Sequence, residues 1–125
     1  MNKERVNEWI PKAYEAIREV KIEENGMVDK SFRGQISTFG AAISMGSLSA
    51  AIAFFSDAGS ASVDRTKLMK ALNRMLNPKG SSDFYFYVKD RIDKGQEEQC
   101  REDVIHAAIA LKLAMNLYPL KDKEA

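Results

Sequence analysis

The sequence predicts an all-α fold, a compact single-domain bundle of about six helices over residues 1–125. Three observations favour this fold class. The 125 residues are 45% hydrophobic and 30% charged, which suits one small globular domain and excludes a disordered chain. Apolar residues recur at three- and four-residue intervals along most of the chain, the spacing of a helix face. One strand-like run, residues 84–88, has no second run with which to pair.

The first helix is expected to begin near the N-terminus and to end at Asn25 and Gly26, which favour turns. Its apolar positions are Val6, Ile10, Ala13, Ile17 and Val20. Pro11 lies inside this pattern. Because proline lacks an amide hydrogen and crowds the preceding turn, we expect the helix to be kinked near Pro11 or to start afresh there.

An uncharged run of 23 residues separates Arg33 from Asp57. Ten of these residues are polar or glycine, and Gly46 lies in the middle. A membrane-spanning helix needs about 20 predominantly apolar residues, so we expect two buried helices joined at Gly46 instead.

The helix before Gly46 should start near Asp29 or Ser31. It presents a narrow apolar stripe made of Phe32, Ile36, Phe39 and Ile43. The helix after Gly46 has Ser47 as a suitable N-cap, because a serine oxygen can accept a hydrogen bond from a free amide of the first turn. It should end before Asp57.

A fourth helix is expected after the small-residue loop 59–62, with Ser62 or Asp64 as its N-cap. Its apolar stripe is Leu68, Met69, Leu72, Met75 and Leu76. Three cations fall on the opposite face, namely Lys67, Lys70 and Arg74. The sequence Asn-Pro-Lys-Gly at residues 77–80 should end this helix.

Residues 84–88 (FYFYV) have strand propensity but no partner strand, so we expect a short helix closed by Gly95. Its inward residues should be Tyr85, Val88 and Ile92. The last helix is expected from about Glu97 to Tyr118. It is apolar on nearly every side, which is typical of a central helix. The tail, residues 119–125, is expected to be frayed.

Positive and negative charges nearly cancel, with 19 Lys and Arg against 18 Asp and Glu. This balance excludes a wholly basic nucleic-acid binder, so a site for a polyanion must be a local patch. The single cysteine cannot form an internal disulfide, and no apolar secretory segment follows the first residues. We therefore expect a cytoplasmic protein.

The reactive side chains argue against an enzyme and against a bound metal or cofactor. His106 has Glu102 and Asp103 one turn before it, but nothing completes this two-ligand edge. Cys100 lies among acidic residues as well as beside Arg101, which favours an inert thiol. A small enzyme that uses a metal or a thiol would need His106 as a ligand or Cys100 as a nucleophile. We expect neither residue to have such a role.

Clustered cations are the best candidates for a polyanion site. Residues 63–80 carry five positive charges against one acid, Asp64. Such side chains can follow phosphates without reading bases, although a solvated face opposite the core has the same pattern. Lys30 and Arg33 form a smaller pair. Lys112 stands alone in an apolar helix, where it must reach solvent, find a partner or face a groove.

Three segments carry a family resemblance: residues 9–15 (WIPKAYE), 46–54 (GSLSAAIAF) and 110–114 (ALKLA). They are similar to the first helix, a Gly-Leu-x-x-Ala-Leu-Ala-Phe stretch and the last helix of one family, in the same order and spacing. That family is the small subunit of type III-B CRISPR effector complexes, the Cmr modules. The chain departs from the family pattern at Ser47, which is inserted after Gly46, and at Leu113, where the family often has arginine.

The resemblance implies a non-catalytic helical subunit of an RNA-guided, RNA-targeting complex in antiviral defence. It implies several copies arranged head to tail beside the backbone subunits, along the path of the target RNA and the CRISPR RNA. It also implies RNA contacts at Lys12, Arg18 and Lys112. Leu113 would weaken the contact of the last helix, and Ser47 would change the helix junction.

Together, the charge pattern and the resemblance give eight candidate RNA-binding residues. They are Lys12, Arg18, Lys30, Arg33, Lys67, Lys70, Arg74 and Lys112. The expected protein partners are the other subunits of the effector complex, especially the backbone subunit, and further copies of this chain. The expected nucleic-acid partners are target RNA and CRISPR RNA. No association with a membrane is expected. The alternative is a free-standing helical adaptor or regulator. It would dimerise through the small residues of its second and third helices, such as Gly40, Ala41 and Ala42.

Overall fold

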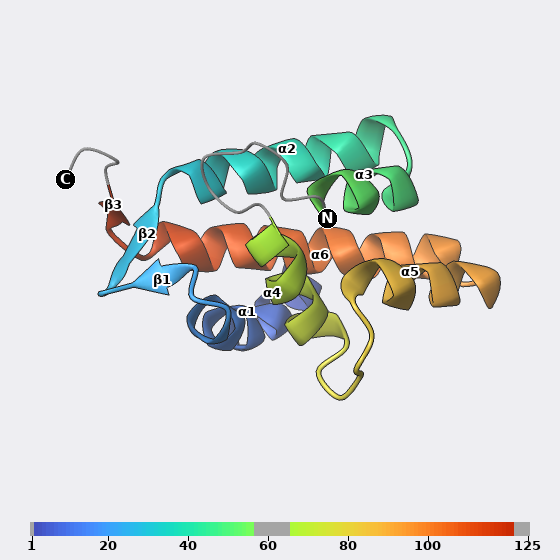
Figure 1. Ribbon diagram of the computed structural model, residues 1–125, viewed down its shortest axis with the longest axis horizontal. Coiled ribbons are helices and arrows are strands. Elements are labelled where there is room, and N and C mark those ends of the chain that lie inside the picture. Colours follow the sequence, from blue (N-terminus) through green and yellow to red (C-terminus); the bar gives the residue numbers. More distant parts are fainter. Residues whose placement is uncertain (1, 57–65, 122–125) are drawn as a thin grey trace.

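The computed structural model describes residues 2–56 and 66–121, and it confirms the all-α class (Figure 1). The helices of these ranges are α1 (Lys3–Glu19), α2 (Ser31–Met45), α3 (Leu48–Phe55), α4 (Thr66–Leu76), α5 (Phe84–Asp93) and α6 (Glu97–Asn116). Most of their bounds lie close to the predicted ones, but α1 ends at Glu19, well before the expected end at Asn25 and Gly26, because residues 23–24 form a strand. The expected caps of the fourth helix, Ser62 and Asp64, lie outside the described residues.

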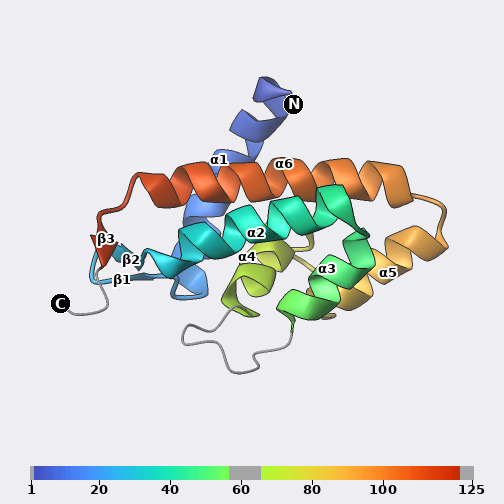
Figure 2. The ribbon, with the colours of Figure 1, turned by 90° about the horizontal axis from the view of Figure 1, so that it is seen from above.

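α6 is the central helix, as its sequence predicts. It runs along the molecule with α2 above it and α1 below it in the view of Figure 1, and α4 and α5 also pack against it (Figure 2). Its buried residues are Cys100, Val104, Ala107, Ala108, Ala110, Leu111, Ala114 and Met115. Many of them are alanines, which allow the axes of neighbouring helices to approach closely.

The apolar stripes predicted for the other helices form the rest of the core. All four stripe residues of α2 are buried, and Phe39 packs edge-on against Phe55 of α3, with ring centroids 5.4 Å apart. In α4 the buried residues are Leu68, Met69, Ala71, Leu72 and Met75. One hydrophobic cluster therefore joins the described helices.

Residues 84–88 are helical, as expected. The Asp83 carboxylate caps α5 by accepting a hydrogen bond from the amide of Phe86 at 2.9 Å. Val88 is buried and Ile92 is partly buried, while Phe84, which periodicity did not select, is also buried. Gly95, with φ of +79°, follows this helix and adopts the left-handed conformation that favours glycine.

α1 continues through Pro11 without interruption, so the helix does not start afresh there. Asn2 caps it, because the Asn2 side-chain oxygen accepts hydrogen bonds from the amides of Glu4 and Arg5. The expected kink at Pro11 stays a prediction.

A small sheet corrects the expectation that the chain has no strands. β1 (Glu23–Glu24) and β2 (Met27–Asp29) form an antiparallel hairpin, and β3 (Leu120–Lys121) pairs parallel with β2. Asn25 and Gly26 have φ of 56° and 76°, so they form a tight hairpin turn as well as following the helix. Leu120 and Lys121 of the expected frayed tail are thus paired, and residues 122–125 lie outside the described residues.

Candidate nucleic-acid interface

Several cations line a cleft where α4 crosses the end of α1. Its volume is 580 Å³. Residues from the end of α1, from α4 and from the loop after α4 line it: Glu19, Val20, Lys21, Lys70, Asn73, Arg74, Asn77, Pro78, Gly80, Ser81 and Ser82. We call this feature the α1–α4 cleft. Three cationic side chains against one carboxylate give its lining a net positive charge.

Two contacts join the walls of the α1–α4 cleft. Arg74 forms an ion pair with Glu19, with Nη1 and Oε2 3.2 Å apart. The Lys67 ammonium donates a hydrogen bond to the Lys21 carbonyl at 3.0 Å and lies 3.7 Å from a carboxylate oxygen of Glu24. Lys67 is therefore committed to contacts within the protein, which the spacing of the sequence could not show.

The predicted basic face of α4 is thus divided between two roles. Lys70 and Arg74 line the α1–α4 cleft, whereas Lys67 holds α4 against the chain that follows α1. Lys21 is a cation that sequence reasoning missed. Its φ of 62° is the left-handed conformation of a residue that ends a helix. The sequence feature that could have indicated Lys21 is its position between the first helix and the turn at Gly26.

The other predicted cations lie apart from the α1–α4 cleft lining. Lys12 is exposed on α1, with its ammonium 4.7 Å from the centre of the Trp9 ring. Arg18 is exposed in the last turn of α1, and Lys30 and Arg33 lie at the start of α2. The structure does not bring these residues and the α4 cations together at one cleft.

Lys112 faces a groove, one of the three outcomes expected for it. The groove lies between α2 and α6 and has a volume of 300 Å³. Its lining is mainly apolar or small, with residues such as Ile36, Gly40, Ala41 and Ile109. The exposed position of Lys112 keeps its ammonium hydrated while its stem covers this apolar surface.

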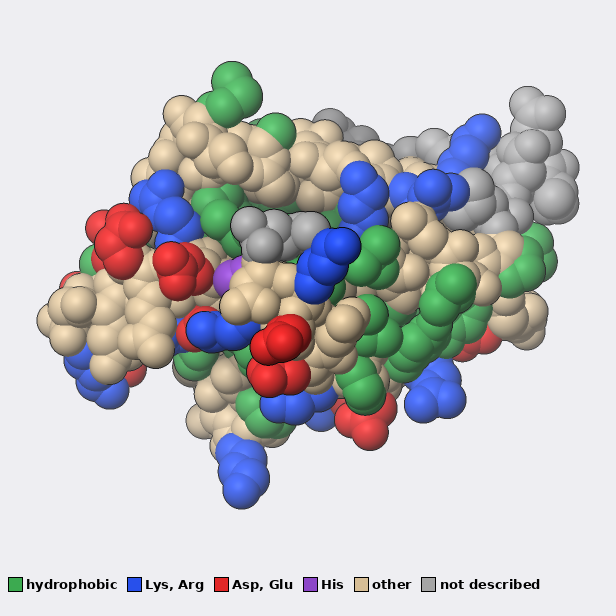
Figure 3. Space-filling view, turned by 180° about the vertical axis from the view of Figure 1, so that it is seen from behind, with side chains coloured by type: hydrophobic (Ala, Val, Ile, Leu, Met, Phe, Trp, Pro, Cys, Tyr) green, Lys and Arg blue, Asp and Glu red, His purple; other side chains and the backbone are tan. Residues whose placement is uncertain are grey.

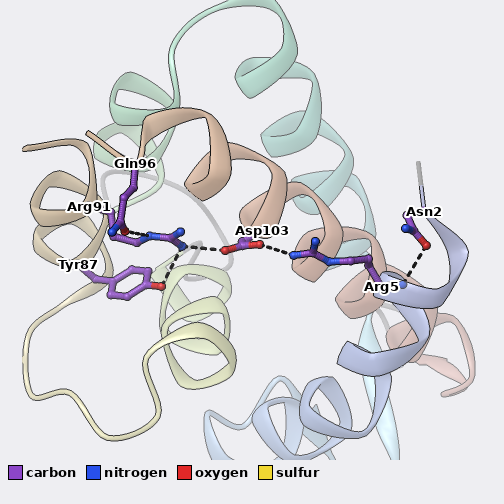
Figure 4. A network of polar contacts seen from close by, with 6 residues as sticks. All are labelled: Asn2, Arg5, Tyr87, Arg91, Gln96 and Asp103. Atoms are coloured by element: carbon purple, nitrogen blue, oxygen red, sulfur yellow. Dashed lines mark hydrogen bonds and ion pairs between the residues drawn. The ribbon is translucent and has the colours of Figure 1, made fainter. Parts of the chain in front are cut away.

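Asp103, considered above as half of a metal-binding edge, has a structural role instead (Figure 4). Its two carboxylate oxygens accept hydrogen bonds from Arg5 at 2.8 Å and from Arg91 at 2.9 Å. Burial lowers the pKa of Arg91, but hydrogen bonds to Asp103 and Tyr87 outweigh burial and raise it. Within the described ranges, no group of three His, Cys, Asp or Glu residues could hold a metal ion.

The other reactive candidate, Cys100, is buried in α6. Burial raises the pKa of its thiol above the ordinary value of 9.0, despite the opposing influence of Arg91. The thiol therefore stays protonated at neutral pH, and a protonated thiol is a poor nucleophile.

Comparison with known families identifies the chain. The family model described as CRISPR-associated protein (Cas_Cmr5) matches residues 5–118, nearly the whole chain. The chain belongs to the Cas_Cmr5 family. It is therefore a small subunit of the type III-B Cmr modules, as the three sequence segments indicated. No curated protein and no solved structure matches it.

The two positions at which the resemblance implied a departure from the family pattern have definite places in the structure. Ser47 is the N-cap of α3, and its hydroxyl accepts a hydrogen bond from the amide of Ala50 at 3.0 Å. Ser47 thus begins a helix directly after the junction at Gly46. Leu113 is 43% exposed on α6, so it places an apolar side chain at the surface next to Lys112.

The surface of this Cas_Cmr5 chain mixes both signs of charge. Seen from behind, cations and carboxylates are interspersed, and hydrophobic side chains gather toward the side on which α6 ends (Figure 3). Among the helices of the described residues, none has the length and hydropathy needed to cross a bilayer.

Proposed function

We propose that this chain is a non-catalytic, cytoplasmic subunit that holds target RNA and CRISPR RNA in a type III-B effector complex, through phosphate contacts that do not depend on sequence. The match of the Cas_Cmr5 model to residues 5–118 carries this proposal. The α1–α4 cleft supplies the surface, because it gathers Lys21, Lys70 and Arg74 at one place. Cations on helices can contact phosphates while leaving the bases unread.

The charge of the whole chain determines how such a subunit would act. With a formal net charge of +1, an isolated copy has little long-range attraction for RNA. Several copies that engage one strand gain affinity together, because each later contact is intramolecular. Weak binding by one copy and strong binding by the assembled complex are therefore the expected behaviour.

Copies arranged head to tail need two different surfaces, which the exposed hydrophobic side chains supply. Met45, Phe54 and Phe86 are 88%, 58% and 60% exposed on α2, α3 and α5. Leu117 is 73% exposed at the other end of the molecule, where α6 ends (Figure 1). Unlike surfaces at opposite ends suit an open filament that follows the backbone subunits.

The groove between α2 and α6 supports the alternative of a free-standing adaptor that dimerises through small residues. Gly40 and Ala41 line this groove, where a second helix could approach closely. Light scattering on the isolated chain tests this alternative. A stable dimer that Ala41→Glu abolishes, with no co-purification of Cmr subunits, would favour the adaptor.

The proposed RNA contact is tested by charge reversal in the reconstituted effector complex. Lys70 and Arg74, the two α4 cations that line the cleft, are both changed to Glu, and target RNA affinity is measured over a range of salt concentrations. We expect weaker capture and a smaller salt dependence, by about 0.7 in the log–log slope for each phosphate that the variant no longer binds.

A matched control applies the same change of charge elsewhere. Lys3 and Lys89 are exposed on α1 and α5 and do not line the α1–α4 cleft. Their reversal to Glu should leave a larger share of RNA affinity intact. Equal affinity and equal salt dependence for the wild type and the α4 variant would remove α4 from the RNA path.

A further inference from the structure

The α1–α4 cleft is built of polar groups that are already held in place. The Asn73 side-chain amide donates to the carbonyl of Ser82 at 2.9 Å, and the amide of Gly80 donates to the carbonyl of Asn77 at 3.1 Å. These bonds attach the loop after α4 to α4 itself. The contact of Lys67 with the Lys21 carbonyl fixes the opposite wall. Ordering this surface around a ligand would therefore cost little free energy.

The three cations of the cleft are not in the same state. Arg74 is occupied by Glu19, whereas Lys21 and Lys70 have no carboxylate at ion-pair distance from their ammonium groups within the described ranges. The Arg74 and Glu19 side chains are 58% and 47% exposed, so water and salt screen their attraction. This pair can open without disturbing the fold.

We propose that the α1–α4 cleft binds RNA phosphate backbone and that Glu19 is a built-in competitor for the phosphate at Arg74. The proposal rests on the proposed function and adds a residue that weakens binding. Lys21 and Lys70 attract the strand first. A phosphate of the strand already held by these lysines then displaces the Glu19 carboxylate from Arg74, because the exposed Arg74–Glu19 pair is weak.

The displaced carboxylate stays within the cleft, where it repels the phosphate that replaced it. Binding by one copy is thereby kept weak and readily reversible. An assembly of several copies still holds its RNA, because the contacts act together. Glu19 would thus favour RNA held by the whole complex over RNA held by stray single subunits.

The test measures binding of a fluorescent oligouridylate to the isolated full-length chain at low salt. Glu19→Gln removes the competing charge and should tighten binding about fivefold, the effect of one like-charge contact near a surface. The unfolding midpoint should not change. Glu8→Gln, the same charge change at an exposed position earlier in α1, should have a much smaller effect.

A double-mutant cycle shows whether Glu19 acts through Arg74. Arg74→Gln alone should weaken binding, and Glu19→Gln should give a much smaller gain in that background. Equal gains from Glu19→Gln and Glu8→Gln would overturn the competitor role, as would an equal gain with and without Arg74.

The outcomes separate the two proposals. If Glu19→Gln binds like the wild type while charge reversal of α4 abolishes RNA capture by the complex, Glu19 is not a competitor and the proposed function stands. If neither change alters RNA binding, the α1–α4 cleft does not contact RNA, and both proposals fail at this surface.

Discussion

Asp103 is the residue on which the polar contacts between α1, α5 and α6 converge. It joins Arg5, 98 residues away in the sequence, to Arg91, which also contacts Tyr87 and Gln96 (Figure 4). The side chains of Asp103 and Arg91 are only 15% and 13% exposed. Water therefore cannot replace either partner fully, and the loss of one leaves the other poorly solvated.

Asp103→Ala is expected to lower the free energy of unfolding by about 2–3 kcal/mol, because it leaves the Arg91 guanidinium partly buried without its carboxylate. Urea denaturation measures this loss. The matched control is Asp90→Ala, which breaks a pair with Lys94 of similar length, 2.9 Å, at the surface. The control should lose no more than about 0.5 kcal/mol. Equal losses would show that the Asp103 network adds nothing beyond a surface pair.

For single residues, the sequence indicated which side chains could form a site better than it indicated their contact partners. It selected Lys70 and Arg74 as cations of a polyanion site, and both line the α1–α4 cleft. It could not show that Lys67 bonds to the Lys21 carbonyl, nor that Asp103 pairs with Arg5. Spacing along one helix determines which face a side chain shares, but a partner on another helix depends on how the two helices cross.

Among the elements, α1 carries a proline in its interior. Pro11 has no amide hydrogen to donate to the carbonyl one turn earlier, and it is exposed. Nearby, Ala13 is buried in the core and Ile10 packs against it, so contacts of the buried face stabilise the helix. α1 therefore stays helical through tertiary packing, despite a residue that is unfavourable in a helix.

Pro11→Ala is expected to stabilise the protein by about 1–3 kcal/mol, because it restores a backbone hydrogen bond and a residue of high helix propensity. Thermal unfolding followed by circular dichroism measures the change, and helicity should rise slightly. Glu15→Ala, at another exposed position of α1, is the control and should change stability by less than about 0.5 kcal/mol. A lower melting temperature for Pro11→Ala would mean that packing of α1 on α6 depends on the expected kink at Pro11.

Elements with strong periodicity were predictable, and elements defined by pairing were not. The stripe of α2 and the apolar sides of α6 follow directly from side-chain spacing. The sheet was missed because β1 and β3 contain two residues each, too few to show alternation. Its long-range contact, an amide hydrogen bond from Val28 to the Pro119 carbonyl at 3.0 Å, joins segments that no local pattern connects.

Over the whole molecule, exposed apolar side chains are the features that the core does not explain. Single exposed hydrophobic residues are common on soluble proteins. Here, however, Leu113 and Leu117 lie one helical turn apart where α6 ends, and both are exposed. This arrangement suits a contact with another copy of the chain in the filament that we propose.

Leu117→Glu is expected to leave the isolated chain folded, because Leu117 is 73% exposed, and to reduce the number of copies in the assembled complex. A charge placed in an apolar contact must lose its water, which weakens association. Native mass spectrometry counts the copies. Thr38→Glu, at an exposed position on α2, adds the same charge and should retain the wild-type number. An unchanged count for Leu117→Glu would exclude this end of α6 from contacts between copies.

The order of the helices along the chain has a consequence for how the protein is made. α6 contacts α1, α2, α4 and α5, yet it is the last of these helices to leave the ribosome. Until residue 116 has been synthesised, the faces of α1, α2, α4 and α5 that pack on α6 stay uncovered, although some of these helices also contact one another. Stable folding should therefore wait until α6 has been synthesised, and nascent chains stalled before α6 should be targets for chaperones and proteases.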